Sequence, residues 1–104
     1  MDLVVQVYAV TKGFPKEEEF GLKSQLRRAA VSIPSNVAEG LTRRSRKDKL
    51  YFLNVSQASL SEVDAQFEIS CRLGFLDQDL YDAVERQCSE VQMLLNGLIR
   101  NIES

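Results

Sequence analysis

Apolar residues recur at every third or fourth position along most of the chain, which is the spacing of one face of an α-helix. The pattern breaks at three places, and it therefore predicts four helices. In the first helix the spaced apolar positions are Leu3, Val7, Val10 and Phe14. This helix is expected to end at residues 12–15, because Gly13 suits a left-handed cap and Pro15 cannot continue a helix.

The glutamates at positions 17–19 are expected to open the second helix, because acidic side chains stabilise the positive end of a helix dipole. Its inward-facing residues are predicted to be Leu22, Leu26, Ala29, Ala30, Ile33, Val37 and Leu41. Pro34 lies inside this stripe and costs about 3 kcal/mol in a helix interior unless the structure accommodates it. Either the helix is kinked at Pro34, or it breaks there and Ser32 or Asn36 caps a new start. The apolar spacing continues in phase through Pro34, which favours one kinked helix.

The third helix has a clear start and a clear end in the sequence. Residues 40–42 mark the corner before it, and Ser45 followed by Asp48 matches a capping box. The helix is predicted to run to about Leu73, with Gly74 as its C-terminal cap.

Asp77 or Asp79 is expected to start the fourth helix. Its apolar stripe is predicted to consist of Leu80, Val84, Gln87, Val91, Leu94, Leu95, Leu98 and Ile102. Four helices joined by short corners predict an all-α fold, an antiparallel up-and-down four-helix bundle.

The third helix has two apolar faces, whereas a surface helix of a bundle needs only one. One face consists of Phe52, Leu53, Leu60, Val63, Phe67 and Cys71. The other face, roughly opposite at about 100° per residue, consists of Tyr51, Val55, Ala58, Ala65, Ile69 and Leu73. A helix buried on both sides of so small a bundle indicates a subunit interface. The alternative is extra cover within the chain, from the first helix or from the residues around Phe75 and Leu76.

Length and composition are those of one globular domain spanning residues 1–104. The chain is 44% hydrophobic and 27% charged, which argues against disorder. No apolar run approaches the roughly 20 residues of a membrane span. The first residues carry neither the basic region nor the cleavage site of a signal peptide, so a cytoplasmic location is expected.

The residues that are missing exclude several kinds of chemistry. The chain has no histidine, which removes His-based catalytic triads, Glu-x-x-His di-iron sites and His-containing zinc sites. Cys71 and Cys88 alone do not close a zinc site, and at about 1.5 Å per residue they lie too far apart along the third and fourth helices to pair. Gly-rich phosphate-binding loops are also absent. We therefore expect no metal, no cofactor and no enzymatic activity.

Basic residues are concentrated in one segment, although the whole chain carries a net charge of −2. Residues 23–49 hold eight Lys and Arg against two acidic residues, whereas residues 50–104 hold three against nine. The density is highest at the corner before the third helix, where the cations are Arg43, Arg44, Arg46, Lys47 and Lys49. Cations oppose the dipole at a helix N-terminus by about 0.3–1 kcal/mol each, whereas an external anion is favoured there.

The corner therefore predicts an anion site, and the expected ligands are the phosphates of RNA or DNA, which suit the planar fork of Arg. Lys23 and Arg27 are further candidates for the same patch. Two alternatives stay open, namely contact with an acidic protein surface and a role in solubility alone.

A second polar feature lies on the second helix. Arg28, Ser32, Ser35 and Glu39 share one face of it, at helical spacing. This ladder is interpreted as a structural hydrogen-bond network that sets helix register, with a small binding site as the alternative.

Residues 20–40, FGLKSQLRRAAVSIPSNVAEG, resemble the 23S rRNA intervening sequence protein family, a family of small four-helix bundles. Supporting motifs are FPKEE at 14–18, RRSRK at 43–47 and LGFL at 73–76. The family is similar to the accessory variability determinant of diversity-generating retroelements. The resemblance implies a ring-shaped homo-oligomer, typically a homopentamer, that binds nucleic acid. It also implies a reverse transcriptase or another protein as a further partner, and it brings no enzymatic activity.

Overall fold

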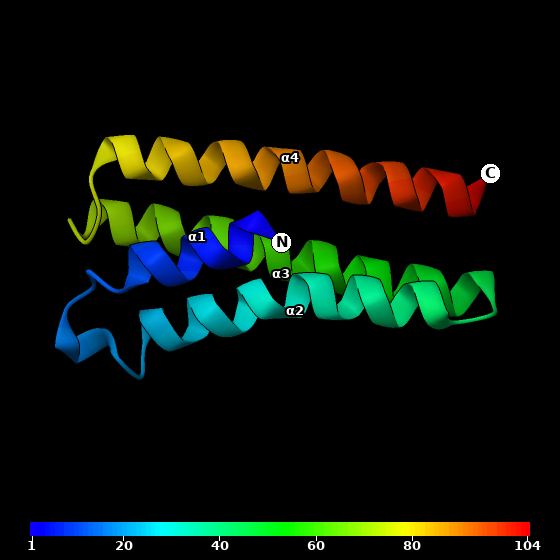
Figure 1. Ribbon diagram of the computed structural model, residues 1–104, viewed down its shortest axis with the longest axis horizontal. Coiled ribbons are helices and arrows are strands. Elements are labelled where there is room, and N and C mark those ends of the chain that lie inside the picture. Colours follow the sequence, from blue (N-terminus) through cyan, green and yellow to red (C-terminus); the bar gives the residue numbers. More distant parts are fainter.

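The computed structural model describes residues 1–104, and its regular structure is entirely helical (Figure 1). Successive long helices run antiparallel, each packs against the next, and the first also packs against the last. The elements are α1 (Asp2–Thr11), the 3-10 turn η1 (Lys16–Glu18), α2 (Leu22–Thr42), α3 (Arg46–Arg72) and α4 (Gln78–Glu103). The predicted all-α fold with four helices is confirmed.

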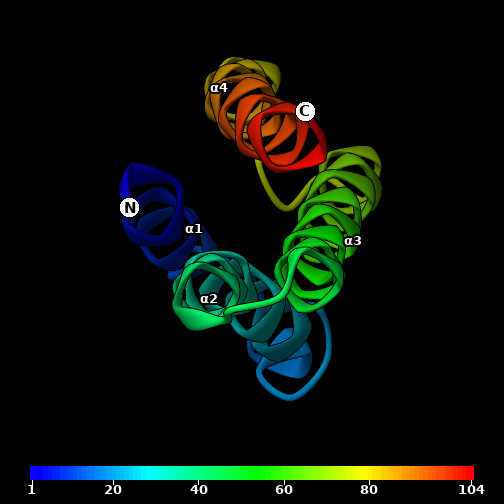
Figure 2. The same cartoon turned by 90° about the vertical axis from the view of Figure 1, so that its right-hand side faces the viewer.

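The helix α1 is much shorter than the other three. It has 10 residues, whereas α2, α3 and α4 have 21, 27 and 26. It lies beside the first part of α2 and closes the bundle only there (Figures 1 and 2). The other end, where α2 turns into α3 and α4 finishes, is built from three helices.

A single core runs between the helices. Its buried hydrophobic residues are Leu3, Val7, Phe14, Leu26, Ala29, Ala30, Ile33, Leu53, Leu60, Val63, Phe67, Leu76, Val84, Cys88, Val91 and Leu95. Three residues that the sequence pattern placed inside are exposed: Leu41, Leu80 and Leu94. Leu41 lies near the end of α2, where α1 does not cover it. On α4 the buried positions include Val84 and Cys88, whereas Leu80 and Leu94 face outward.

The first connection differs from its prediction. Gly13 is not left-handed, because Gly74 is the one glycine with a positive φ. The glutamates at 17–19 do not open the long helix either, since they belong to η1 and its end. Glu18 still acts on α2, because its Oε1 accepts a hydrogen bond from the Leu22 backbone N–H at 3.1 Å.

Pro34 lies inside one continuous α2, so the prediction of a single helix is correct. Side chains donate to the carbonyls just before the proline. Asn36 Nδ2 donates to the Ser32 oxygen and Ser56 Oγ donates to the Ile33 oxygen, both at 2.8 Å. Ser56 is fully buried on α3, so its bond ties the proline segment to the neighbouring helix.

The turn between α3 and α4 agrees with its prediction. Gly74 has φ +82°, and the Phe75 N–H bonds back to the Ser70 oxygen at 2.9 Å. Asp77 caps α4, accepting from the Leu80 N–H at 2.9 Å. Both cysteines are free, as their separation predicted. No helix carries an apolar stretch of the length that crossing a bilayer requires.

Gly40 sets the distance between α2 and α3 at their shared corner. It is buried, and a Cβ on it would lie 3.1 Å from Phe52 Cβ and 3.2 Å from the Lys49 carbonyl oxygen. Only a residue without a side chain permits this approach. Gly97 on α4 has no such neighbour within 4 Å.

We expect these two glycines to respond oppositely to alanine. Gly97→Ala should raise the free energy of unfolding by about 0.5–1 kcal/mol, because alanine is the better helix former. Gly40→Ala should lower it, because α2 and α3 must move apart. Urea unfolding followed by circular dichroism measures both values, and equal gains for the two variants would contradict the close approach at Gly40.

Candidate nucleic-acid interface

The connection between α2 and α3 consists of residues 43–45, and the corner comprises these residues together with the first residues of α3, up to Lys49. Arg43 takes an extended conformation directly after α2, and Ser45 caps α3 by accepting from the Asp48 N–H at 3.0 Å. The predicted cap is therefore present. The backbone N–H groups of the first α3 turn have no partner within their own helix, so this end of α3 favours an anion.

Three of the five corner cations are held by the fold. Arg43 pairs with Glu39 at 3.1 Å, and its guanidinium lies over the Phe52 ring, 4.8 Å from the centroid. Lys49 donates from Nζ to the Leu41 carbonyl at 3.4 Å, near the end of α2. Arg46 donates to the main-chain oxygen of Ser104 at 3.5 Å, which links the corner to the end of α4.

The remaining two cations, Arg44 and Lys47, make neither an ion pair nor a side-chain hydrogen bond within the chain, and both are exposed. Glu39 is the one carboxylate paired with a corner cation. Asp48, the exposed acid of the first α3 turn, makes no ion pair with any of the cations. Five cations against Glu39 and Asp48 leave the corner with a net positive charge.

Two aromatic residues at the corner were assigned only to helix faces by the sequence analysis. Tyr51 and Phe52 meet edge to face, with ring centroids 5.1 Å apart and an interplanar angle of 86°. The spacing from Lys47 to Tyr51, one helical turn, is a signal that places this ring beside a corner cation.

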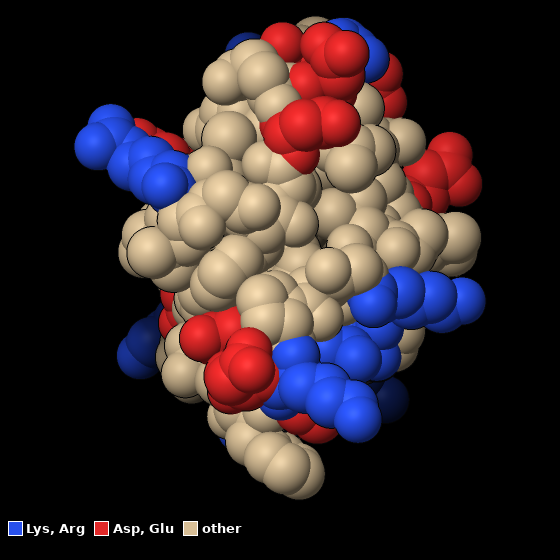
Figure 3. All heavy atoms as spheres, turned by 90° about the vertical axis from the view of Figure 1, so that its left-hand side faces the viewer, with Lys and Arg blue, Asp and Glu red and all other residues tan.

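Lys23 and Arg27 lie at the other end of the bundle, away from the corner. Because α2 rises about 1.5 Å per residue, Arg27 and Arg43 are separated by about 24 Å along it. Lys23 pairs with Glu19 at 2.9 Å, and this hydrogen bond lowers the pKa of Glu19. Figure 3 views that opposite end and shows acidic and basic side chains both present there.

Arg27 is bound to α1. Its Nε donates to Thr11 Oγ1 at 2.9 Å, its Nη2 donates to the Tyr8 carbonyl at 3.1 Å, and its guanidinium lies 4.5 Å from the Tyr8 ring centroid. In this position it fastens the short helix to α2.

The four residues of the predicted polar ladder do not form a network. Arg28 bonds to Ser24 and Glu39 pairs with Arg43, because Arg28 and Glu39 are about 16 Å apart along the helix. Ser35 is exposed. Only Ser32 reaches α3, through its hydroxyl contact of 2.8 Å with Ser59.

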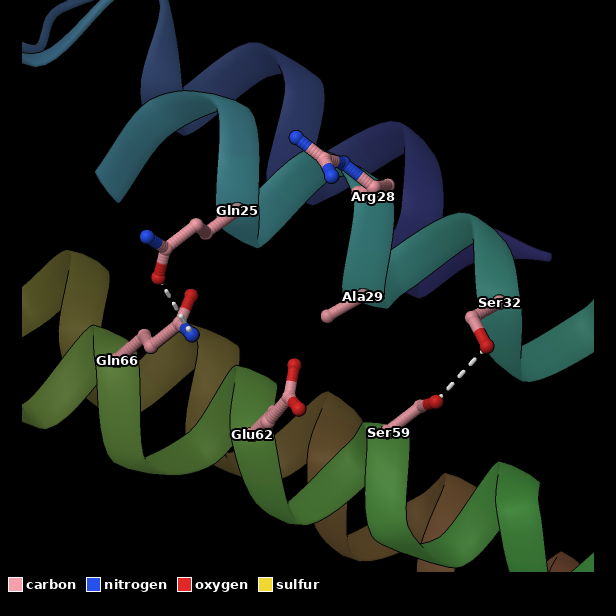
Figure 4. Close-up of a pocket in the computed structure, with 7 residues that line it drawn as sticks. All are labelled: Gln25, Arg28, Ala29, Ser32, Ser59, Glu62 and Gln66. Carbon is pink, nitrogen blue, oxygen red and sulfur yellow. Dashed lines mark hydrogen bonds between the residues drawn. The ribbon is translucent and has the colours of Figure 1, made fainter. Parts of the chain in front are cut away.

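The side of α2 that carries Arg28 and Ser32 forms one wall of an open polar groove of about 610 Å³ along α3 (Figure 4). The groove is crossed by the Ser32–Ser59 contact and by a hydrogen bond of 3.3 Å from Gln66 Nε2 to Gln25 Oε1. These two contacts join α2 to α3 across the groove, whereas Gln66 Oε1 is buried without a partner and Glu62 makes no ion pair.

A carboxyl pair lies between α3 and α4. Asp64 Oδ1 and Glu85 Oε1 are buried and have no hydrogen-bond partner, and both residues line a cavity of about 160 Å³ together with Cys88. The hydrogen bond to Asp64 that a protonated Glu85 can donate, reinforced by burial and by charge repulsion, raises the pKa of Glu85 to about 7. Burial raises the pKa of the Cys88 thiol to about 12. Burial, together with the negative charge of Glu85, also raises the pKa of the Tyr81 hydroxyl to about 12. No group of three or more Cys, Asp or Glu side chains is placed to hold a metal ion.

Comparison with known proteins identifies the family. The family model described as 23S rRNA-intervening sequence protein matches residues 1–97. The chain belongs to this family. Its fold is also that of a crystal structure of a protein of unknown function from the S23 ribosomal protein family of Bacteroides thetaiotaomicron VPI-5482. The TM-score is 0.80 at 24% identity, over 92% of this chain and 87% of that one. No curated protein sequence matches.

The carboxyl pair should make stability depend on pH. The pKa of Glu85 is higher in the folded chain than its ordinary 4.5, so the folded state binds this proton more tightly. The stabilisation is complete below about pH 4.5 and is lost as the pH rises through about 7. The urea concentration at the midpoint of unfolding should therefore decrease as the pH is raised from about 5 to about 8.

Glu85→Gln keeps a hydrogen-bond donor facing Asp64 and removes the titration, so it should flatten this pH dependence. Glu90→Gln, at an exposed position of the same helix, is the matched control and should retain it. An identical pH profile for Glu85→Gln and the unmodified protein would show that the pair does not titrate in this range.

Proposed function

We propose that this protein is a non-enzymatic, self-associating helical bundle that binds nucleic-acid phosphates through the corner between α2 and α3. The observation that carries the proposal is the pair of exposed cations, Arg44 and Lys47, that no group of the chain neutralises. We propose the cytoplasm as its location, where Cys71 and Cys88 stay reduced.

The chemistry of the corner suits phosphate. Arg44 and Lys47 flank Ser45 at the start of α3, where the backbone N–H groups and the helix dipole attract anions. Folding alone gains nothing from cations at this helix end, because they oppose the dipole. A phosphate would reverse that cost. The family name refers to the intervening sequences of 23S rRNA, which makes RNA the first ligand to test.

Self-association is supported by exposed apolar side chains on α3 and in the α1–α2 part of the chain. The helix α1 does not contact α3. At the end of the second face away from the corner, about 27 Å along α3 from Tyr51, Ile69 and Leu73 are 48% and 58% exposed. Val5 on α1 and Phe20 in the connection before α2 are 68% and 94% exposed. A ring needs two different surfaces on opposite sides of each subunit. In the proposed ring, a pentamer by resemblance, repeated corners would bind one strand with avidity.

The second candidate function is a structural adaptor whose corner binds an acidic protein surface. The acidic start of α4, with Asp77, Asp79 and Asp82 exposed, favours it, because a neighbouring copy would offer such a surface. The two candidates differ in their response to RNA.

The corner is tested by removing its two free charges. Arg44→Gln with Lys47→Gln should weaken RNA binding and reduce the slope of log K against log salt by about 1–2, because each lost phosphate contact releases fewer counterions. Fluorescence anisotropy of a labelled RNA oligonucleotide across a sodium chloride series measures both quantities.

Lys12→Gln with Lys16→Gln is the matched control, since it removes two exposed charges at the opposite end. It should change binding much less. If the corner variant binds as tightly as the unmodified protein, the corner is not the site. If the unmodified protein fails to bind RNA even at low salt, the adaptor is the better description.

Self-association is tested on α3. Light scattering at micromolar concentration should give a multiple of the 11.8 kDa chain mass. Ile69→Glu should dissociate the assembly, because it places a charge in an apolar interface. Met93→Glu, at a 71% exposed position of α4 outside both faces, should leave it intact. A monomeric unmodified protein would refute the ring.

A further inference from the structure

An exposed aromatic ring adjoins the free cations of the corner. Tyr51 is 62% exposed on α3, and its side chain makes no hydrogen bond within the chain. Packing therefore does not require its ring, and no hydrogen bond requires its hydroxyl. The ring is therefore free to contact a ligand that the cations beside it attract.

One side of the Tyr51 ring is in contact with Phe52. Tyr51 meets Phe52 edge to face, and Phe52 lies against Gly40 and beneath the Arg43 guanidinium. Arg43 is in turn paired with Glu39. This chain of contacts restricts the Tyr51 ring, so a planar group can stack on its free face at a small cost in entropy.

The ring lies one helical turn from the free cation Lys47. Lys47 and Tyr51 are one helical turn apart, so their Cβ atoms lie about 5–6 Å apart on one side of α3. Arg44 lies just before the Ser45 cap. A strand whose phosphates contact Arg44 and Lys47 therefore brings a base within reach of Tyr51.

We propose that the corner selects single-stranded over duplex nucleic acid, with an unstacked base on Tyr51 and the phosphates on Arg44 and Lys47. This inference rests on the proposed function. Bases inside a duplex are stacked on one another and cannot present a face to the ring, whereas a single strand can. Every base has such a face, so the preference is for strandedness and tolerates any sequence.

Tyr51→Ala tests the stacking. Its affinity for a labelled single-stranded RNA should fall about ten-fold, the loss of one stacked base, while its affinity for a duplex of the same length stays unchanged. The salt slope should also stay unchanged, because no phosphate contact is lost. Tyr51→Phe keeps the ring and should bind normally.

Met93→Ala is the matched control. It removes a large apolar side chain that is 71% exposed on α4, outside both proposed contact faces, and it should not alter single-strand binding. Circular dichroism of each variant confirms that the helices are retained.

Tyr51→Trp gives a direct readout, because the chain contains no other tryptophan. Its fluorescence should be quenched by the single strand and not by the duplex. Quenching by both ligands, or by neither while anisotropy reports binding, would overturn the stacking.

The two proposals fail in different ways. If neither ligand binds the unmodified protein, the proposed function fails and the strand preference fails with it. If both bind equally, or if Tyr51→Ala weakens both equally, the corner binds phosphates and the strand preference alone is wrong. If Tyr51→Ala changes the mass measured by light scattering, the ring belongs to a contact between copies, which also overturns the preference.

Discussion

The close packing of α2 against α3 is the contact on which the rest of the molecule depends. It is the most extensive helix contact in the bundle, and glycine and serine contribute to it alongside the apolar core residues of both helices. Gly40 lets the backbones approach at the corner, and Ser56 reaches the Ile33 carbonyl beside Pro34. Pro34 removes the hydrogen bond to the Ala30 carbonyl, and the Ser56 bond ties the segment just before the proline to α3. The same contact fixes where α2 ends, and so where the cations of the corner are presented.

The electrostatics of the corner are local. The molecule is 43 Å long, and the acidic start of α4 lies at the end opposite the corner (Figure 1). At physiological ionic strength charges are screened within about 8 Å, so those carboxylates do not cancel the field around Arg44 and Lys47. A net charge of −2 and a pI of 5.1 therefore describe the solubility of the chain and say little about what this corner attracts.

The four helices and the caps of α3 and α4 could be predicted from sequence because their signals are local, whereas the predicted Gly13 cap and the start of the second helix at residues 17–19 were wrong. Ser45, Gly74 and Asp77 act on backbone groups within a few residues of themselves, and the structure has them as predicted. Predictions that joined distant positions did less well. Arg27 shares a charge sign with the corner, but the length of α2 separates them, and a helical wheel hides this because it discards the rise along the axis. The Arg28–Glu39 ladder failed for the same reason.

The sequence did not predict that the Tyr51 ring is exposed at the corner, because this depends on which neighbouring side chains cover each ring. Tyr51 and Phe52 are adjacent in sequence, yet Phe52 is held between Gly40 and Arg43 whereas Tyr51 is open to solvent. Apolar periodicity assigned both to helix faces and could not distinguish an interface from a stacking surface. The distinction comes from neighbouring side chains. A ring beside Ile69 and Leu73 alone would suit another protein, whereas a ring one turn from Lys47, in contact with the Phe52 ring that carries Arg43, suits a flat, negatively charged ligand. The position of Tyr51 at the corner end of α3 favours the second.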